Sequence, residues 1–204
     1  MMRRNLHASI LPALLIGAAF CLPLPATAAQ VVAMTLDEIV DACDVAVWGQ
    51  VTAVYSERVA DAPGRLHTVV VVTPYEIMAS DAEQHSLDNV RFSVPGGTNG
   101  RFAQIVMGAP KYVVGQEVVV MASRQPKSRL LKIIGLSLGS YVVEQLPTLS
   151  IPGPTAVSDR QGLGIIRRSP MGHAEEAKNL LVDRRPLDEL LDTIRARTTL
   201  RSGR

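Results

Sequence analysis

Hydrophobic and polar residues alternate with a period of two between Val45 and Glu144, which is the pattern of β-strands. Interruptions by glycine, proline and polar residues divide this stretch into six predicted strands, at 45–56, 66–78, 89–94, 117–122, 130–136 and 139–144. Pro74 falls inside the second strand and predicts an edge or a bulge there, because proline has no amide hydrogen to donate. The segment 99–112 is predicted to be irregular.

A helical period precedes the strands. Thr35 and Glu38 have the spacing of a capping box, in which each side chain accepts a hydrogen bond from the other residue's amide. Four apolar residues at helical spacing follow, and they are Leu36, Ile39, Val40 and Cys43. A short amphipathic helix is therefore expected. Cys43 closes its apolar face, so a buried small hydrophobe explains it better than a catalytic nucleophile or an intermolecular disulfide.

The C-terminal third has two predicted parts. Proline, glycine and serine are frequent after residue 145, which predicts an extended arm over 146–185. Pro186 then begins a second helix, at the position where a missing amide hydrogen costs least. Its apolar stripe consists of Leu187, Leu190, Leu191 and Ile194. The last residues, 198–204, are expected to fray.

Short, closely spaced strands with few helices among them favour a mainly β fold over an α/β fold. About six strands suit a small closed barrel of the OB-like, Greek-key type, with a short N-terminal helix and a C-terminal helix. The expected domain layout is a signal peptide at 1–29, a β-barrel domain at 30–145, the arm at 146–185, and a C-terminal helix and tail at 186–204.

The first residues have the chemistry of an export signal. Arg3 and Arg4 form a basic start, and residues 10–21 form an apolar stretch. Small residues then predict cleavage after Ala28 or Ala29. The apolar stretch is shorter than the roughly 20 residues that span a bilayer, so we expect a cleaved leader rather than a membrane anchor. The protein is therefore expected in the periplasm or outside the cell, with no transmembrane span after cleavage.

Composition and charge narrow the choice of partner. Hydrophobic residues make up 47% of the 204 residues and aromatic residues only 4%, so the core must be mostly aliphatic. Lys and Arg number 21 against 19 Asp and Glu, and the predicted leader removes two arginines, which leaves the remainder balanced. A balanced chain has no electrostatic drive towards nucleic acid. Residues 160–204 are richer in basic side chains, which indicates a solvated surface or weak attraction to anionic envelope surfaces.

Seven segments carry a combined pattern, and they are Thr35 to Val40, Asp44 to Val51, Val94 to Gly97, Gly108 to Pro110, Val114 to Val118, Gly135 to Gly139 and Pro186 to Leu190. Together they resemble a common family of exported bacterial proteins, over residues 34–197. The resemblance implies export and an OB-like barrel, but no established activity. The barrel is similar in shape to secreted modules such as the tissue inhibitors of metalloproteinases, which use an N-terminal cysteine and disulfides that this chain lacks.

Gly135 to Gly139 matches the G-x-S-x-G nucleophile elbow, with Ser137 at its centre. The elbow requires a helix after the serine, whereas the residues that follow, Ser140 to Val143, favour a strand. A tight turn between two strands explains the glycines better, because glycine permits the backbone angles of such turns. A serine hydrolase that uses Ser137 is kept as an alternative function.

A glycine-rich loop follows the third predicted strand. Its candidate binding residues are Pro95, Gly96, Gly97, Asn99, Gly100, Gly108 and Pro110. A phosphate-binding P-loop would continue with lysine, a hydroxyl residue and a helix, but Arg101 and Phe102 follow instead. Binding residues often lie on loops held by a rigid framework, so a recognition surface is expected between Pro95 and Pro110.

The remaining candidates for chemistry are scattered. His67, His85 and His173 lie far apart without partners at metal-ligand spacing, so we predict no metal site and no cofactor. We predict an exported, non-enzymatic binding or interaction module with a protein partner, in a specific version a proteinase inhibitor or an accessory protein. The alternatives are the Ser137 hydrolase and an envelope-associated structural protein held by its basic tail.

Overall fold

The computed structural model describes residues 29–59, 64–80, 88–126, 128–145, 153–168, 174–176 and 182–202. The predicted signal peptide lies outside these residues except for Ala29, which begins strand β1 (Ala29–Val32). Cleavage after Ala28 or Ala29 therefore stays a prediction. The described residues form a mainly β structure with two helices, as the sequence predicts. Neither of these helices has the length and apolar character needed to cross a membrane.

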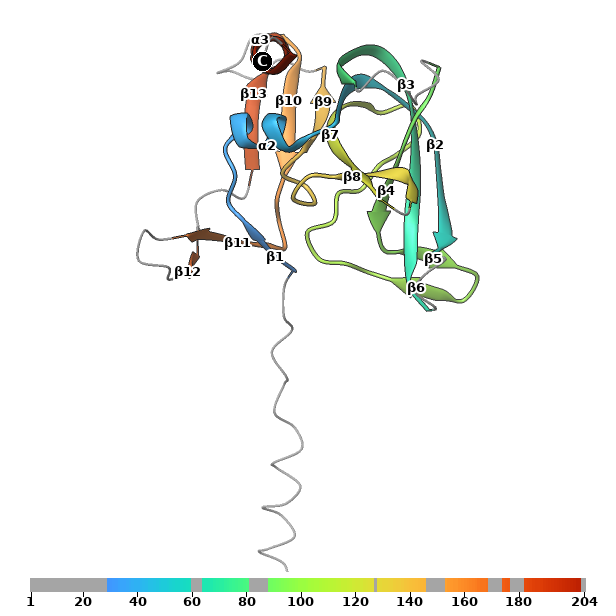
Figure 1. Ribbon diagram of the computed structural model, residues 1–204. Helices are drawn as coiled ribbons and strands as arrows, with labels where there is room; N and C mark the ends of the chain where they lie inside the picture. Colours follow the sequence, from blue (N-terminus) through green and yellow to red (C-terminus); the bar gives the residue numbers. More distant parts are fainter. Residues whose placement is uncertain are drawn as a thin grey trace, which may run out of the picture.

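An eight-stranded mixed sheet makes up most of the fold (Figure 1). Its strands, in spatial order, are β13 (Val182–Pro186), β10 (Thr155–Asp159), β9 (Ser140–Glu144), β7 (Glu117–Gln125), β2 (Val45–Arg58), β3 (Leu66–Ser80), β4 (Val90–Pro95) and β8 (Ser128–Ile133). Neighbouring strands are antiparallel except β4 and β8, which run parallel. All six strands predicted from the alternation are present, as β2, β3, β4, β7, β8 and β9.

Five of these strands close into a ring. β7 pairs with β2 along one edge and with β8 along part of the other, so the path β2–β3–β4–β8–β7 returns to β2. The sequence predicts about six strands in one closed structure, but β9 lies outside the ring. It pairs with β7 at Val118 to Val120, whereas β8 takes over the same edge from Ala122 onwards. Met121, between them, donates to Gly139 and accepts from Ile134, both in the turn that joins β8 to β9.

Pro74 lies at an irregular position, as its sequence context predicts. β4 pairs with β3 only from His67 to Val72, so Pro74 lies beyond that neighbour. On the other side it faces Gly49, where the register between β2 and β3 shifts. A Cβ atom on Gly49 would lie 2.3 Å from the carbonyl oxygen of Thr73, so the close approach of the two strands requires glycine. Such bulges increase local twist and bend, which suits long strands that curve around a ring.

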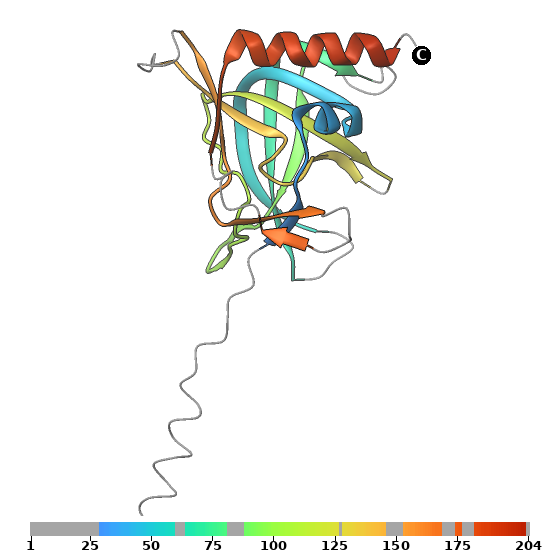
Figure 2. The same cartoon turned by 90° about the vertical axis from the view of Figure 1, so that its left-hand side faces the viewer.

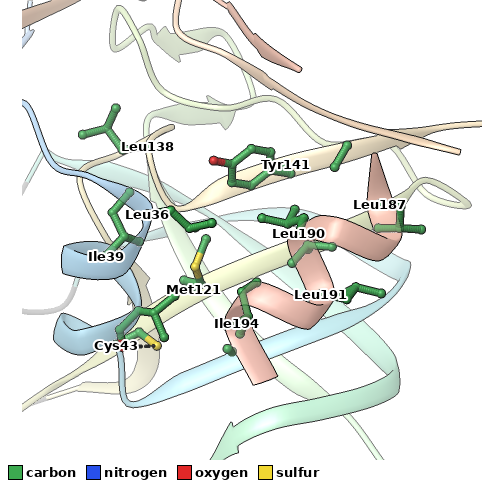
Figure 3. Close-up of a cluster of buried hydrophobic side chains, with 14 of the residues drawn as sticks. Leu36, Ile39, Cys43, Met121, Leu138, Tyr141, Leu187, Leu190, Leu191 and Ile194 are labelled. Atoms are coloured by element: carbon green, nitrogen blue, oxygen red, sulfur yellow. Dashed lines mark hydrogen bonds between the residues drawn. The ribbon is translucent and has the colours of Figure 1, made fainter. Parts of the chain in front are cut away.

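The two faces of the sheet bury two separate cores. On β7, Val118 and Val120 belong to the core inside the ring, whereas Val119 and Met121 belong to the core between the sheet and the two helices. Both faces of this strand are therefore buried, which explains its continuous hydrophobic run. Figure 3 shows the second core, where side chains from both helices meet those of the sheet.

Helix α2 (Leu36–Ala42) confirms the predicted capping box. The Thr35 amide donates to Oε2 of Glu38 at 2.7 Å, and Oγ1 of Thr35 accepts from the Glu38 amide at 3.2 Å. The buried residues Leu36 and Ile39 face the second core, as the helical spacing predicts. The cap satisfies amide groups that would otherwise lack partners, so this short helix begins at a position fixed by its own sequence.

Helix α3 (Leu187–Ser202) keeps its last turn, so the fraying predicted from residue 198 is wrong for the residues up to Ser202. Nη1 of Arg201 donates to the carbonyl oxygen of Cys43 at 2.6 Å, directly beyond the end of α2. The contact satisfies a carbonyl group at one helix end with a cation from the end of the other. Tertiary packing therefore stabilises a turn that the sequence alone leaves free.

The segment 146–185 was expected to be an extended arm, but its described residues form strands of two sheets. β10 and β13 pair with each other, and β10 also pairs with β9. β13 includes Pro186, so α3 begins one residue later than predicted. β11 (Leu163–Arg168) forms a three-stranded sheet with β1 and β12 (Ala174–Glu176). These strands are short and lie next to glycine and proline, which obscures their alternation in the sequence.

Candidate functional site

The predicted binding residues lie on one segment, residues 95–115, which we name the hairpin loop. It leaves β4 at Pro95 and forms a small hairpin of β5 (Gly97–Asn99) and β6 (Phe102–Gln104). This hairpin occupies part of the stretch that was predicted to be irregular. In Figure 1 it lies at the lower end of the ring, beside the end of β2.

The first half of the hairpin loop is held against the ring by hydrogen bonds. The Thr98 amide donates to Oγ of Ser56 at 3.0 Å, and the Leu66 amide donates to Oε1 of Gln104 at 2.7 Å. A Cβ atom on Gly97 would lie 2.6 Å from Oγ of Ser56, and the φ angle of Gly97 is +151°. Glycine is therefore required for the hairpin to lie this close to β2.

The second half of the hairpin loop is held by packing. Tyr112 is buried, and its hydroxyl lies 2.5 Å from Oγ of Ser140. A Cβ atom on Gly108 would lie 2.8 Å from the side chain of Leu163, so Gly108 permits close contact with β11. Pro95 and Pro110 line the same small cavity, which brings the two ends of the predicted binding segment together.

The hairpin loop exposes an unusual set of large apolar side chains. Phe102 is 76% exposed and Ile105 is 81% exposed. Half of the ten large hydrophobic residues that are exposed in the described ranges lie here, and they are Phe102, Ile105, Met107, Val113 and Val114. Asn99, Arg101 and Lys111 are exposed in the same segment. Apolar side chains displayed among polar ones are typical of interaction sites.

The predicted binding residues in this loop are its glycines and prolines together with Asn99. The glycines and prolines shape the backbone, and the exposed apolar side chains next to them are not among the predicted residues. Hydrophobic residues inside a glycine-rich, irregular segment are the signal that could have found them. Such residues follow neither strand nor helix periodicity, so the sequence pattern does not predict that they are buried in the core.

A second candidate site, which sequence reasoning missed, is a cleft of about 1010 Å³ between α2, β13 and the segment that joins β1 to α2. Figure 2 looks onto this side of the molecule, with α2 in blue. The cleft is lined by Val32 to Ile39, Tyr141, Arg160, Val182, Asp183, Arg185 and Thr193. These residues are distant in sequence and meet because β9, β10 and β13 are neighbours in the sheet.

Three polar side chains at the cleft donate hydrogen bonds to the carboxylate of Asp183. The Tyr141 hydroxyl donates to Oδ2 of Asp183 at 2.9 Å, and Nη2 of Arg160 donates to the same oxygen at 3.0 Å. Nε of Arg185 donates to both carboxylate oxygens, at 3.2 and 3.1 Å. The Arg160 side chain is only 7% exposed and that of Asp183 is 17% exposed. Within the described part of the chain, Nε of Arg160 has no hydrogen-bond partner.

The electrostatics of the cleft combine two guanidinium groups with one partly buried carboxylate. Burial raises the pKa of Tyr141 to about 12, and the negative charge of Asp183 acts in the same direction, so Tyr141 is a neutral donor at physiological pH. Asp37 and Glu38 also line the cleft. Hydrogen bonds from Thr35 lower the pKa of Glu38, whose carboxylate is thereby engaged in the helix cap.

Ser137 does not have the geometry of a catalytic nucleophile. It is 1% exposed, and its hydroxyl has no hydrogen-bond partner among the residues that the structure describes. Leu136 has a φ angle of +59°, and strand β9 follows the turn where the elbow would need a helix. The Ser137 carbonyl accepts from Oγ of Ser158 at 2.8 Å, which ties the turn to β10. The predicted tight turn between two strands is confirmed.

Cys43 is buried, as predicted from its place on the helix face. Its thiol donates to the carbonyl oxygen of Val40 at 3.2 Å. Burial raises the pKa of the Cys43 thiol to about 11, although Arg201 acts against this shift. Reactive cysteines have a lowered pKa and solvent access, so Cys43 has the opposite properties.

The histidines form no cluster in the described part of the chain. His67 lies on β3, where its Nε2 is 3.5 Å from a carboxylate oxygen of Glu57. His85 and His173 lie outside the described residues. The described residues contain no group of three or more His, Cys, Asp and Glu side chains that could hold a metal ion.

Comparison with known proteins finds no relative of this chain. No family model, no curated protein and no solved structure matches it. The resemblance to exported bacterial proteins therefore stays a prediction, and the function has to be argued from the hairpin loop and the cleft themselves.

Proposed function

We propose that this protein is an exported, non-enzymatic binding module that presents the hairpin loop to a protein partner. The observation that carries the proposal is the combination of exposed Phe102 and Ile105 with a backbone held firmly to the ring. Large apolar side chains in water contribute nothing to the fold, so their display on an ordered loop favours a role in recognition.

The ring supports an OB-like barrel as the framework of this module. Five strands close on themselves, and the closure between β4 and β8 is parallel while the other pairs in the ring are antiparallel. A five-stranded Greek-key barrel of the OB type binds its ligands through loops and one sheet face. A loop fixed at both ends by such a barrel binds with little loss of conformational entropy, which favours affinity.

The amphipathic character of the hairpin loop favours a protein surface as partner. Phenylalanine, methionine and arginine are enriched at protein interfaces, and Phe102, Met107 and Arg101 lie close together in sequence here. A proteinase inhibitor that inserts a rigid loop into a partner is one specific version of this function. An accessory protein that docks on a larger assembly is another.

The basic tail gives less support to an envelope-associated structural role. Arg195 forms a bidentate pair with Glu76, with Nε and Nη2 donating at 2.8 and 2.6 Å. Arg197 pairs with Asp41 on α2. These guanidinium groups are engaged within the protein, so they add little to attraction towards anionic surfaces. A hydrolase that uses Ser137 is disfavoured by the burial of its side chain.

Site-specific cross-linking tests the proposal directly. A photoreactive phenylalanine analogue at Phe102 should give a discrete protein adduct in cells that express the full chain, and Ile105→Ser should abolish that adduct. The matched control places the same analogue at Tyr75, which is exposed on β3 away from the hairpin loop. Identical adducts from both positions, or none from Phe102, would contradict the proposal.

A further inference from the structure

We propose that the cleft beside Asp183 is a binding site for a monocarboxylate with an apolar body, held by Arg185 and Arg160. This site is separate from the hairpin loop, so its failure would leave the proposed function intact. It uses different residues, a different face of the fold and a different kind of interaction.

Hydrogen-bond donors are in excess around Asp183. A structural link between β9, β10 and β13 needs one cation opposite one carboxylate, but two guanidinium groups are present. Nε of Arg160 is buried and lacks a hydrogen-bond partner in the described ranges. Arg185 uses only its Nε on Asp183, and no described residue accepts a hydrogen bond from its two Nη groups. Its side chain is 35% exposed, so these donors can reach a ligand, and an anion in the cleft would give them an acceptor.

The shape and lining of the cleft also suit a small molecule. Its volume of about 1010 Å³ is at the upper end of the range of small-molecule sites, which usually join an apolar lining to a few placed polar groups. Val32, Met34 and Leu36 supply apolar lining, and Val32 is exposed. A ligand that carries a carboxylate towards Arg185 can therefore place an apolar body along these residues.

The charge of the lining selects a carboxylate over a phosphate. Asp37 and Glu38 line the same cleft, and they repel an anion that carries two charges more strongly than one that carries a single charge. Asp183 faces two guanidinium groups, and Glu189 also acts on Arg185, so a ligand with a single carboxylate adds the least negative charge to this cluster. The planar guanidinium fork also matches the two oxygens of a carboxylate.

Two sources have this chemistry, a free organic acid and the C-terminal carboxylate of a peptide. Calorimetric titration of the purified protein with octanoate and with N-acetyl-leucyl-leucine distinguishes them, because the tighter ligand identifies the source. N-acetyl-leucyl-leucine amide keeps the apolar body without the charge and should bind about tenfold more weakly or worse than its acid. Inorganic phosphate should not compete with either acid.

Variants on β13 test the residues. Arg185→Gln should weaken binding of the acid about tenfold or more, because it removes the charged fork. The matched control is Arg184→Gln, on the neighbouring residue, which pairs with Glu144 and does not line the cleft. That variant should bind like the unaltered protein. Circular dichroism of both variants checks that the fold is retained.

If Arg185→Gln fails to fold, nuclear magnetic resonance of the unaltered protein tests the proposal instead. Binding of the acid should shift the side-chain ¹⁵Nε resonances of Arg185 and Arg160, and the amide should leave them in place. The proposal is overturned if neither acid binds at about 10 mM, a concentration well above ordinary ligand affinities. It is also overturned if acid and amide bind equally, if phosphate binds more tightly than both acids, or if folded Arg185→Gln binds as the control does.

Discussion

The hairpin loop and the cleft represent opposite ways of building a surface. In the hairpin loop, apolar side chains such as Phe102 stand in solvent while the backbone below them is held by neutral hydrogen bonds. In the cleft, the buried Arg160 and the partly buried Asp183 link neighbouring strands. The exposed apolar side chains are therefore separable from stability, whereas the charged cluster contributes to the fold as well as to ligand binding.

The largest loss of stability is expected when Asp183, the partner of the buried Arg160 charge, is replaced. Asp183→Ala leaves two guanidinium groups without their common carboxylate, so the free energy of unfolding should fall by about 3–5 kcal/mol. Glu144→Ala is the control, because its pair with Arg184 is solvent-exposed and should be worth about 1 kcal/mol or less. Denaturant unfolding measures both. Equal losses from the two variants would show that the cluster adds nothing beyond a surface pair.

Alkaline pH should weaken the same region. Burial raises the pKa of Tyr141 to about 12, against about 10 in an unfolded chain. The folded state favours the neutral phenol, so this contribution is complete below pH 10 and is lost as pH rises towards 12. The loss should amount to about 2–3 kcal/mol at most. Unfolding curves between pH 8 and 12 measure it.

Two variants show which residues cause that loss of stability. Tyr141→Phe should reduce the fall between pH 10 and 12 but not abolish it, because burial also raises the pKa of Tyr112, whose contribution remains. Cys43→Ala should remove an earlier part, between about pH 9 and 11, because burial also raises the pKa of that thiol to about 11. If stability were to stay flat up to pH 12 in the unaltered protein, the buried, neutral state of Tyr141 would be refuted.

A smaller effect is expected at the base of the hairpin loop. Gly97→Ala would place a Cβ atom against Oγ of Ser56 at a φ angle that favours glycine, so stability should fall by about 1–2 kcal/mol. Gly100→Asn is the control, since open space surrounds Gly100 and asparagine tolerates its φ angle of +59°. The control should stay within about 0.5 kcal/mol. Hydrogen exchange at the Thr98 amide should quicken only in Gly97→Ala.

The smallest effect on stability is expected at the exposed side chains. The double variant Phe102→Ser, Ile105→Ser should change the free energy of unfolding by less than about 0.5 kcal/mol, because both side chains lie in water. Co-purification with the partner that the cross-link identifies should be lost in the same double variant. A large destabilisation would mean that these side chains are structural, and the contrast between loop and cleft would then fail.

Local signals explain what could be predicted. The capping box between Thr35 and Glu38 uses residues three positions apart, so the start of α2 is encoded where it occurs. The alternation that predicts β2, β3, β4 and β7 is equally local, because each strand carries its own two-sided pattern. The glycine-rich segment likewise predicts a loop from local sequence, and Gly97 permits the close approach of this loop to β2.

Long-range contacts explain what could not be predicted. The sequence of β10 is short and has little periodicity of its own, so it does not predict a strand. The strand forms by pairing with β9 and β13. The last turn of α3 is held by the carbonyl oxygen of Cys43, which lies far away in sequence. The cleft has the same origin, since Tyr141, Arg160 and Asp183 come from three segments without any shared motif.

The sequence by itself determined the class of structure, the start of the first helix and the position of the exposed loop, because these depend on neighbours within a few residues. The tertiary structure alone decided that five strands close into a ring, that β9 lies outside it, and that two arginines share one partly buried carboxylate. The physical reason is that strand pairing and charge burial join residues whose separation along the chain leaves no trace in the local pattern.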